Sequence, residues 1–201
     1  MVRIYLITDR RVCEDLPSAV AAALSVLPIG SAAVQLREKD LGDAELLELA
    51  EKLSPLCRSA KAPMLINGRV DIAKAARADG VQLPAGGTSL PEARKQLGPG
   101  AVIGQSCHTV EEVLAASTGG ADFALFGPVW ETPGKKAQGM TALVEAVRAT
   151  ALPVFAVGGV TPQRARRAIS AGAHGVACIR AVLGSPNPAA AALDMWKAVT
   201  G

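Results

Sequence analysis

Short apolar runs alternate with longer amphipathic stretches along the chain. Each run is bounded by Gly, Pro or polar residues, which is typical of short strands. Because the runs are apolar almost throughout, they indicate strands buried on both faces, as in a parallel sheet. The predicted strands are Arg3–Thr8, Ala32–Leu36, Pro63–Ile66, Gly80–Leu83, Ala101–Gly104, Asp122–Phe126, Pro153–Val157 and Gly175–Ile179.

The stretches between the strands predict helices, since their apolar residues recur at helical spacing. Ser89 and Thr161 are N-cap candidates, each followed by a proline in the first turn. Thr109 and Glu112 have the spacing of a capping box. The predicted helices are Pro17–Leu27, Asp43–Ser59, Val70–Arg77, Ser89–Leu97, Thr109–Ser117, Thr141–Ala149, a helix from Thr161 to Ala171, and Pro188–Val199.

This alternation of strands and helices predicts an α/β fold with a parallel sheet covered by helices. Eight even units favour a closed (β/α)8 TIM barrel over an open doubly wound sheet. No linker or low-complexity segment divides the sequence, so we expect one domain over residues 1–201. That length is at the lower end for a TIM barrel, about 200 residues.

Composition and charge indicate which classes of binding partner are expected. Half of the 201 residues are hydrophobic, and the net charge is +3. The basic residues are scattered, which argues against nucleic-acid binding, and no long apolar run or signal sequence is apparent. We therefore expect a cytoplasmic protein with a small anionic ligand and no membrane partner. The four cysteines form no CxxC motif, so zinc binding is not expected; Cys57 and Cys178 are predicted to be core residues.

The site of a TIM barrel is built where the strands end. Polar residues, many of them hydrogen-bond donors, follow nearly every predicted strand, which suits an anionic ligand. They are Thr8, Asp9, Gln35, Arg37, Glu38, Lys39, Asn67, Gln82, Ser106, Cys107, His108, Glu131, Thr132, Lys135, Lys136, Gly158, Gly159 and Arg180.

Arg37 and Asn67 are each open to two interpretations. Arg37 alternates with Leu36 as Gln35 does, so it can point inward and bind a carboxylate or phosphate bidentately. The alternative is an ion pair with Glu38 or Asp9. Asn67 offers a donor and an acceptor to a ligand, or it caps the following helix.

His108 follows a strand and precedes a helix N-cap, where a neutral imidazole suited to proton transfer is expected. The alternatives are a loop residue or a cap partner. Cys107 is a weak candidate nucleophile, because adjacent residues seldom face each other. His174 falls at the opposite end of the barrel, and a structural role is predicted. Lys135 and Lys136 form either a solvated basic loop or a lid over an anion.

The paired glycines Gly158 and Gly159 follow the seventh strand. Backbone N–H groups there can approach a phosphate closely, although a tight turn explains the pair equally well. If the turn binds phosphate, a side chain at Gly159 is expected to block the ligand and leave the fold intact.

Several segments together carry a family resemblance that covers essentially the whole chain. They are QLREK at 35–39, INGRVDIA at 66–73, DGVQLP at 79–84, IGQSCHT at 103–109, ADFALFGPVWETPGKK at 121–136 and PVFAVGGVTP at 153–162. In this order and spacing they resemble the thiamine phosphate synthase superfamily. One branch joins a pyrimidine pyrophosphate to a thiazole phosphate with magnesium; the TenI-type branch tautomerises a thiazole intermediate.

The chain departs from the synthase pattern at the metal. Both positions where the resemblance implies a magnesium carboxylate are glycines, Gly68 and Gly87. Thr132 and Lys135 of the synthase loop remain, but Gly134 replaces its second Thr. Asn-Gly-Arg-Val-Asp and the Glu-Thr-x-x-Lys-Lys loop resemble the TenI-type branch instead.

The resemblance therefore implies a thiazole tautomerase, an isomerase of thiamine biosynthesis that needs no metal or organic cofactor. It implies His108 as the catalytic acid and base. The implied substrate-binding residues are Gln35, Arg37, Lys39, Asn67, Ser106, Thr132 and Lys135. The implied phosphate-binding residues are Gly158, Gly159, Ile179 and Arg180, although the Arg180 side chain can also point outward.

Two alternatives remain. One is a magnesium-dependent thiamine phosphate synthase that joins hydroxymethylpyrimidine pyrophosphate to thiazole phosphate. The other is a non-catalytic barrel that binds thiazole phosphate as a regulator. The sequence does not reveal the oligomeric state, and a homodimer is the commonest arrangement for a protein of this kind.

Overall fold

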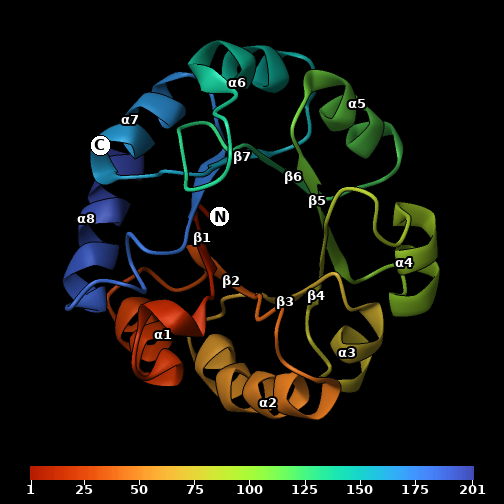
Figure 1. Cartoon of the computed structure of the whole chain (residues 1–201), viewed down its shortest axis with the longest axis vertical. Coiled ribbons are helices and arrows are strands. Elements are labelled where there is room, and N and C mark those ends of the chain that lie inside the picture. Colours follow the sequence, from red (N-terminus) through yellow and green to blue (C-terminus); the bar gives the residue numbers. More distant parts are fainter.

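In the computed structural model, which describes residues 1–201, the apolar runs form eight parallel strands that pair in chain order (Figure 1). The strand β1 pairs with both β2 and β8, so the sheet closes and has no free edge. The predicted barrel is confirmed, and the open doubly wound sheet is wrong. The strands are β1 (Ile4–Ile7), β2 (Ala32–Leu36), β3 (Met64–Asn67), β4 (Gly80–Leu83), β5 (Val102–Cys107), β6 (Phe123–Phe126), β7 (Val154–Val157) and β8 (Gly175–Cys178).

Eight α-helices form a ring around the barrel and cover its outer face (Figure 1). Their buried side chains, such as Leu53 and Met195, join outward-facing strand residues in one core. None of the helices combines the length and the apolar character that crossing a membrane requires. The helices are α1 (Leu16–Ser25), α2 (Asp43–Ser59), α3 (Val70–Ala75), α4 (Leu90–Leu97), α5 (Val110–Thr118), α6 (Gly139–Arg148), α7 (Pro162–Ser170) and α8 (Pro188–Thr200), with a 3-10 helix, η1 (Arg10–Val12), before α1.

A second core fills the inside of the barrel towards the N-terminal ends of the strands. Phe123 lies edge-on to Tyr5 and to Phe155, with ring centroids 5.5 and 5.6 Å apart. Gly175 makes room for these rings, because a Cβ there would lie 2.5 Å from the Phe155 ring and 2.4 Å from the Arg3 carbonyl oxygen. We call Tyr5, Phe123 and Phe155 the aromatic plug, and they close this end of the barrel.

The predicted caps are confirmed at Ser89 and Thr161, whose hydroxyls each accept a hydrogen bond from an N–H in the first helical turn, at 3.3 Å. Thr109 caps α5 in the same way, at 3.2 Å. The capping box is wrong in its second half, since the Glu112 carboxylate accepts from the His108 N–H and not from that of Thr109.

Several predicted boundaries differ from the structure, and the differences at β5 and α3 have a physical reason. The strand β5 continues past Gly104 to Cys107, because Cys107 pairs with Phe126 although polar residues intervene. The helix α3 ends at Ala75 rather than Arg77. Arg77 adopts a left-handed φ of 50°, and its N–H bonds back to the Lys74 carbonyl, so it closes the helix where a glycine is usual.

Candidate functional site

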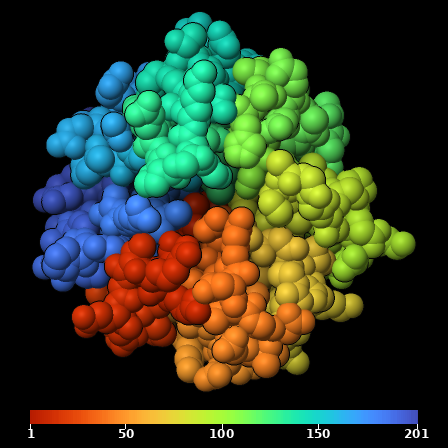
Figure 2. All heavy atoms as spheres, in the orientation of Figure 1, coloured from red at the N-terminus to blue at the C-terminus, as the bar shows by residue number.

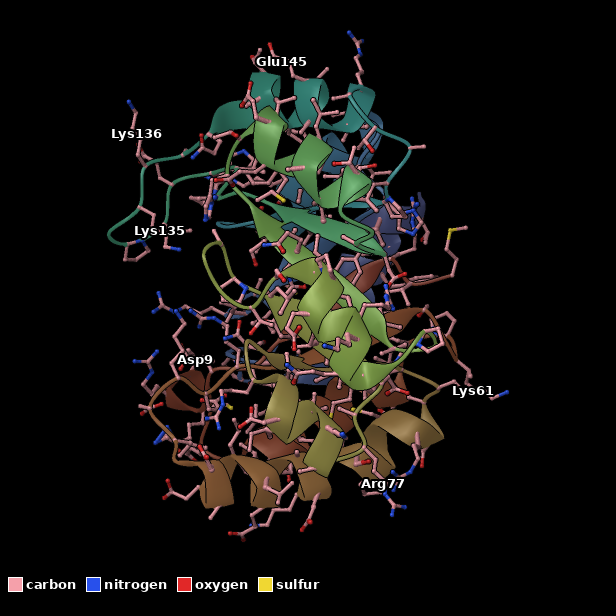
Figure 3. The ribbon with its side chains drawn as sticks, turned by 90° about the vertical axis from the view of Figure 1, so that its right-hand side faces the viewer. Asp9, Lys61, Arg77, Lys135, Lys136 and Glu145 are labelled. Carbon is pink, nitrogen blue, oxygen red and sulfur yellow. The ribbon has the colours of Figure 1, made fainter.

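The carboxyl ends of the eight strands meet on the face of the molecule that Figure 2 shows, and this face is recessed at its centre. Asp9, Lys135 and Lys136 lie at this end of the barrel, whereas Lys61 and Arg77 lie at the opposite end (Figure 3). The polar residues predicted to follow the strands are thus gathered around one mouth.

The floor of the mouth is polar. The Gln82 side chain is fully buried and donates from Nε2 to the Ser106 Oγ at 3.1 Å, while its Oε1 has no hydrogen-bond partner. Gln35 is 1% exposed, and its Nε2 also lacks a partner. Buried polar atoms are nearly always hydrogen-bonded, so these two unpaired atoms, one of them on a side chain beside the Tyr5 hydroxyl, are candidate contacts for a polar ligand. Gln82 lies inside β4 (Gly80–Leu83), and its position in the sequence provided no reason to assign it a role.

Asn67 ends β3 next to Gln82, with which it is in register. The alternative that Asn67 caps α3 is wrong, because the cap position is Arg69 and no side chain bonds there. The chain turns at Gly68, whose φ is 69° and whose N–H donates to the Gln82 carbonyl at 2.8 Å. The Asn67 side chain makes no hydrogen bond within the protein and is left for a ligand.

Arg37 and Lys39 lie where the chain leaves β2. The alternative of an Arg37 ion pair is wrong, because the neighbouring carboxylates have other partners. The Glu38 carboxylate accepts from the Arg10 N–H at 3.0 Å, and Asp9 pairs with Arg11 at 2.8 Å. Both cations are therefore free to meet an anion.

The loop between β6 and α6 carries Thr132 and Lys135. These two residues pair in a short antiparallel bridge, in which the Lys135 N–H donates to the Thr132 carbonyl at 3.0 Å. The bridge folds the tip of the loop back, so that Lys135 stands above the mouth while Lys136 points away from the barrel (Figure 3). Both interpretations of the loop, a lid and a solvated loop, remain compatible with this shape.

His108 directly follows β5. Its ring Nδ1 contacts the Gly127 carbonyl oxygen, which can only accept, so Nδ1 is the donor of this hydrogen bond. Its backbone N–H donates to Glu112. His108 thereby joins the end of β5 to the start of the β6–α6 loop. The nearby Cys107 is buried, which raises the pKa of its thiol to about 12, so a nucleophilic thiolate is not supported.

The turn of Gly158 and Gly159 has φ values of 93° and 63°. The N–H groups of Gly158, Gly159, Ile179 and Arg180 donate no hydrogen bond within the protein. They lie just beyond the paired strands β7 and β8, in which Val157 is in register with Ala177. Four unpaired amides at two adjacent strand ends are suited to a phosphate. We call these four residues the amide cup.

The same turn is packed tightly against the β6–α6 loop. A Cβ on Gly159 would lie 2.9 Å from the Trp130 Cβ. The Arg164 guanidinium stacks on the Trp130 ring at 5.6 Å and donates to the Gly159 carbonyl at 2.7 Å. The expectation that a side chain at Gly159 leaves the fold intact is therefore wrong.

Ile179 is partly exposed at the mouth, and Arg180 is exposed. The Arg180 side chain makes no ion pair with any carboxylate of the chain. It is free to contact a phosphate in the amide cup or to remain in solvent. His174 lies at the opposite end against Phe155, at 5.2 Å between ring centroids, as a structural residue would.

The magnesium ion that the family resemblance implies for a synthase does not fit the residues present. Gly68 and Gly87 bring no oxygen side chain to the mouth, and nowhere do three His, Cys, Asp or Glu side chains group as a metal site would require. The prediction that no cofactor is needed stays a prediction.

Comparisons with known proteins bear on the activity. The chain is 46% identical over 191 residues to a Geobacter sulfurreducens protein whose name describes it as a candidate thiamine-phosphate synthase, covering 92% of this chain and 88% of that protein. It is 39% identical to the thiamine-phosphate synthase of Roseiflexus castenholzii, covering 94% and 84%. These names contradict the predicted thiazole tautomerase, and the expected isomerase has no support among them.

A solved structure and a family model agree with these relatives. The thiamine phosphate pyrophosphorylase of Pyrococcus furiosus superposes with a TM-score of 0.90 at 33% identity, covering 98% of this chain and 95% of that one. The family model described as thiamine monophosphate synthase matches residues 4–182. With the barrel and the polar mouth described above, these matches show that the chain belongs to the thiamine monophosphate synthase family.

Proposed function

We infer that the chain is a thiamine-phosphate synthase that joins hydroxymethylpyrimidine pyrophosphate to a thiazole phosphate. The observation that carries this proposal is that one mouth holds two separate sets of unpaired donors. The amide cup is one set, and the free cations Arg37, Lys39 and Lys135 are the other. A transferase with one phosphate and one pyrophosphate to bind needs two such sets. Relatives between 36% and 46% identical that bear the synthase name support the same activity.

In this reaction the thiazole ring nitrogen attacks the methylene carbon of the pyrimidine. A C–N bond forms while the C–O bond to pyrophosphate breaks, and pyrophosphate leaves with the bonding electrons. No proton has to move, so the protein contributes mainly alignment of the two reactants and stabilisation of the negative leaving group.

The site residues divide between the two reactants. The thiazole phosphate lies in the amide cup, with Arg180 beside it. The buried Gln35 and Gln82 face the heterocycle with their unpaired amide atoms, and Ser106 and Asn67 lie beside Gln82. The pyrophosphate meets Arg37, Lys39 and Lys135, with Thr132 holding the loop that carries Lys135. His108 has no proton to transfer, and its role is to hold the β5 end against the β6–α6 loop.

The test is a coupling assay that follows thiamine phosphate and released pyrophosphate together. Both products should appear in equal amounts, and neither should appear when the thiazole phosphate is omitted. Gln35→Leu removes the unpaired donor in a side chain of similar size, and we expect it to lower kcat/KM by roughly tenfold or more. Lys61→Gln, at the opposite end of the barrel, should match the wild type. No product from folded protein, with magnesium and with EDTA, contradicts the proposal.

A further inference from the structure

The two positions that would carry magnesium carboxylates are occupied by glycines around one proline ring. A Cβ on Gly68 would lie 3.5 Å from the Pro84 Cδ, and one on Gly87 would lie 3.1 Å from the Pro84 Cγ. Gly68 therefore has room for a side chain but has none. At these two positions, the turn after β3 and the loop after β4 bring no carboxylate to the mouth.

No other carboxylate near this place is free to replace the missing ones. Asp43 and Asp71 both pair with Arg69, at 2.7 and 2.6 Å. Glu38 is 5% exposed and is already bonded to the Arg10 N–H. Magnesium held beside a substrate phosphate needs one or two protein carboxylates, and here Asp43 and Asp71 are paired with a cation while Glu38 is occupied by a backbone N–H.

Positive charge takes the place of these carboxylates. A cavity of about 320 Å³ between the ends of β2 and β3 is lined by Lys39, Asn67, Gly68 and the paired Arg69, and also by Glu38, whose carboxylate is bonded to the Arg10 N–H. The Arg37 guanidinium, together with burial and with Lys135, holds the pKa of the Lys39 ammonium below its ordinary value. Three cations that repel one another and have no ion-pair partner lower their mutual repulsion when an anion enters between them.

We propose that this chain binds the pyrophosphate of its substrate without a protein-held magnesium ion, with Arg37, Lys39 and Lys135 neutralising the charge that the metal would neutralise. The proposal rests on the function inferred above, because that function supplies the pyrophosphate. It goes beyond that function by separating this chain from synthases that depend on a metal carboxylate site.

The probe is inorganic pyrophosphate, and the measurement is calorimetric affinity of the full-length protein in EDTA and in magnesium. Wild-type affinity in EDTA should equal or exceed that in magnesium. Lys39→Gln and Lys135→Gln should each weaken binding by roughly tenfold in EDTA. Lys136→Gln is the matched control, since Lys136 leaves the same loop but points away from the barrel (Figure 3), and it should bind as the wild type does. Binding that is tenfold tighter with magnesium, or unchanged in Lys39→Gln and Lys135→Gln, overturns the proposal.

A second variant tests the same idea in the opposite direction. Gly68→Asp restores a carboxylate at a position with space for it, and Asp tolerates the positive φ of 69° better than most residues. We expect weaker pyrophosphate binding than the wild type in EDTA and recovery on adding magnesium. Equal affinity of Gly68→Asp and wild type in both solutions counts against the proposal.

These results also separate this proposal from the proposed function. Tight pyrophosphate binding in EDTA without coupling supports the metal-free site and contradicts the synthase. Coupling that stops in EDTA and resumes with magnesium supports the synthase and contradicts the metal-free site.

Discussion

Gly158 and Gly159 satisfy two requirements at one place, and only one of them concerns a ligand. Their N–H groups make no hydrogen bond within the protein and are available to an anion. The space beside their α-carbons is filled by Pro128 and Trp130, so the β6–α6 loop could not lie against a larger residue. Glycine is needed here even before a ligand binds, because of crowding as well as backbone conformation.

We expect Gly159→Asn to lower the free energy of unfolding by about 1–3 kcal/mol, since its Cβ would lie 2.9 Å from the Trp130 Cβ. Gly134→Asn is the matched control, because Gly134 has a φ of 75° and no atom within 4 Å of its Cβ position. Asn tolerates positive φ, so the pair isolates crowding from backbone strain. Urea unfolding provides the comparison, and equal losses in the two variants contradict the explanation.

Between β1 and α1, the short helix η1 is held mainly by carboxylates at its start. Asp9 caps it, accepting from the Arg11 backbone N–H at 3.2 Å and from the Arg11 Nε at 2.8 Å. Glu38, from the loop after β2, accepts the Arg10 N–H. Two loops at the mouth are therefore joined by charged acceptors rather than by apolar contacts.

The stability that Asp9 contributes should depend on pH. The Arg11 side chain holds the pKa of Asp9 below its ordinary value of 3.8. A carboxyl whose pKa is lower in the folded state contributes stability above its unfolded pKa and loses it as pH falls through the folded pKa. We expect Asp9→Asn to cost about 0.5–1 kcal/mol at pH 7 and less at pH 3, because Arg11 is largely exposed.

Chemical unfolding of the wild type and Asp9→Asn at both pH values measures this difference. Glu14→Gln, an exposed carboxyl nearby that makes no hydrogen bond, should show no such pH dependence. A cost of Asp9→Asn that stays constant from pH 7 to pH 3 argues against the charged cap.

The strands and most helices could be predicted because burial on both faces forces apolar runs, and caps mark helix starts. The helix η1 was not predicted, since Arg-Arg-Val has no apolar period and depends on Glu38, which lies 28 residues further along the chain. The unpaired oxygen of Gln82 was not predicted either, because it is apparent only when the closed barrel surrounds this glutamine of an apolar run.

The placement of the candidate residues was predicted better than the reaction. Arg37, Lys39, Asn67 and Ser106 do lie around one mouth, since strand ends of a barrel must converge. The tautomerase was inferred largely from the missing metal carboxylates at Gly68 and Gly87. A missing carboxylate reports on how charge is neutralised and not on which bond is made, so it was a poor guide to the reaction.

At the scale of the whole molecule, closure depends on the fit between β8 and β1. Gly175 begins β8 and lies against both the Arg3 backbone and the Phe155 ring. There is no space for a methyl group at this seam, since the inside of the barrel is filled by the aromatic plug. The strand β8 can pair with β1 and complete the barrel only if residue 175 has no side chain.

Gly175→Ala should therefore destabilise the entire protein. We expect a loss of about 2 kcal/mol or more and a fall in Tm of at least about 4 °C for a chain of this size. Gly100→Ala, whose Cβ would have no neighbour within 4 Å, should change Tm by less than about 2 °C. Calorimetry measures both Tm values. A Gly175→Ala protein with the Tm of the wild type contradicts the explanation that Gly175 is tightly packed against β1 and the Phe155 ring.

The aromatic plug makes the barrel a blind pocket with a single entrance. In the function proposed above, the reactant beside the buried Gln35 and Gln82 lies deeper in the barrel than the one held at Lys39 and Lys135. In that arrangement the deeper reactant binds first, and the molecule that binds last is released first. The aromatic plug therefore determines the order of binding and release in the proposed reaction, although none of its three rings needs to contact a ligand.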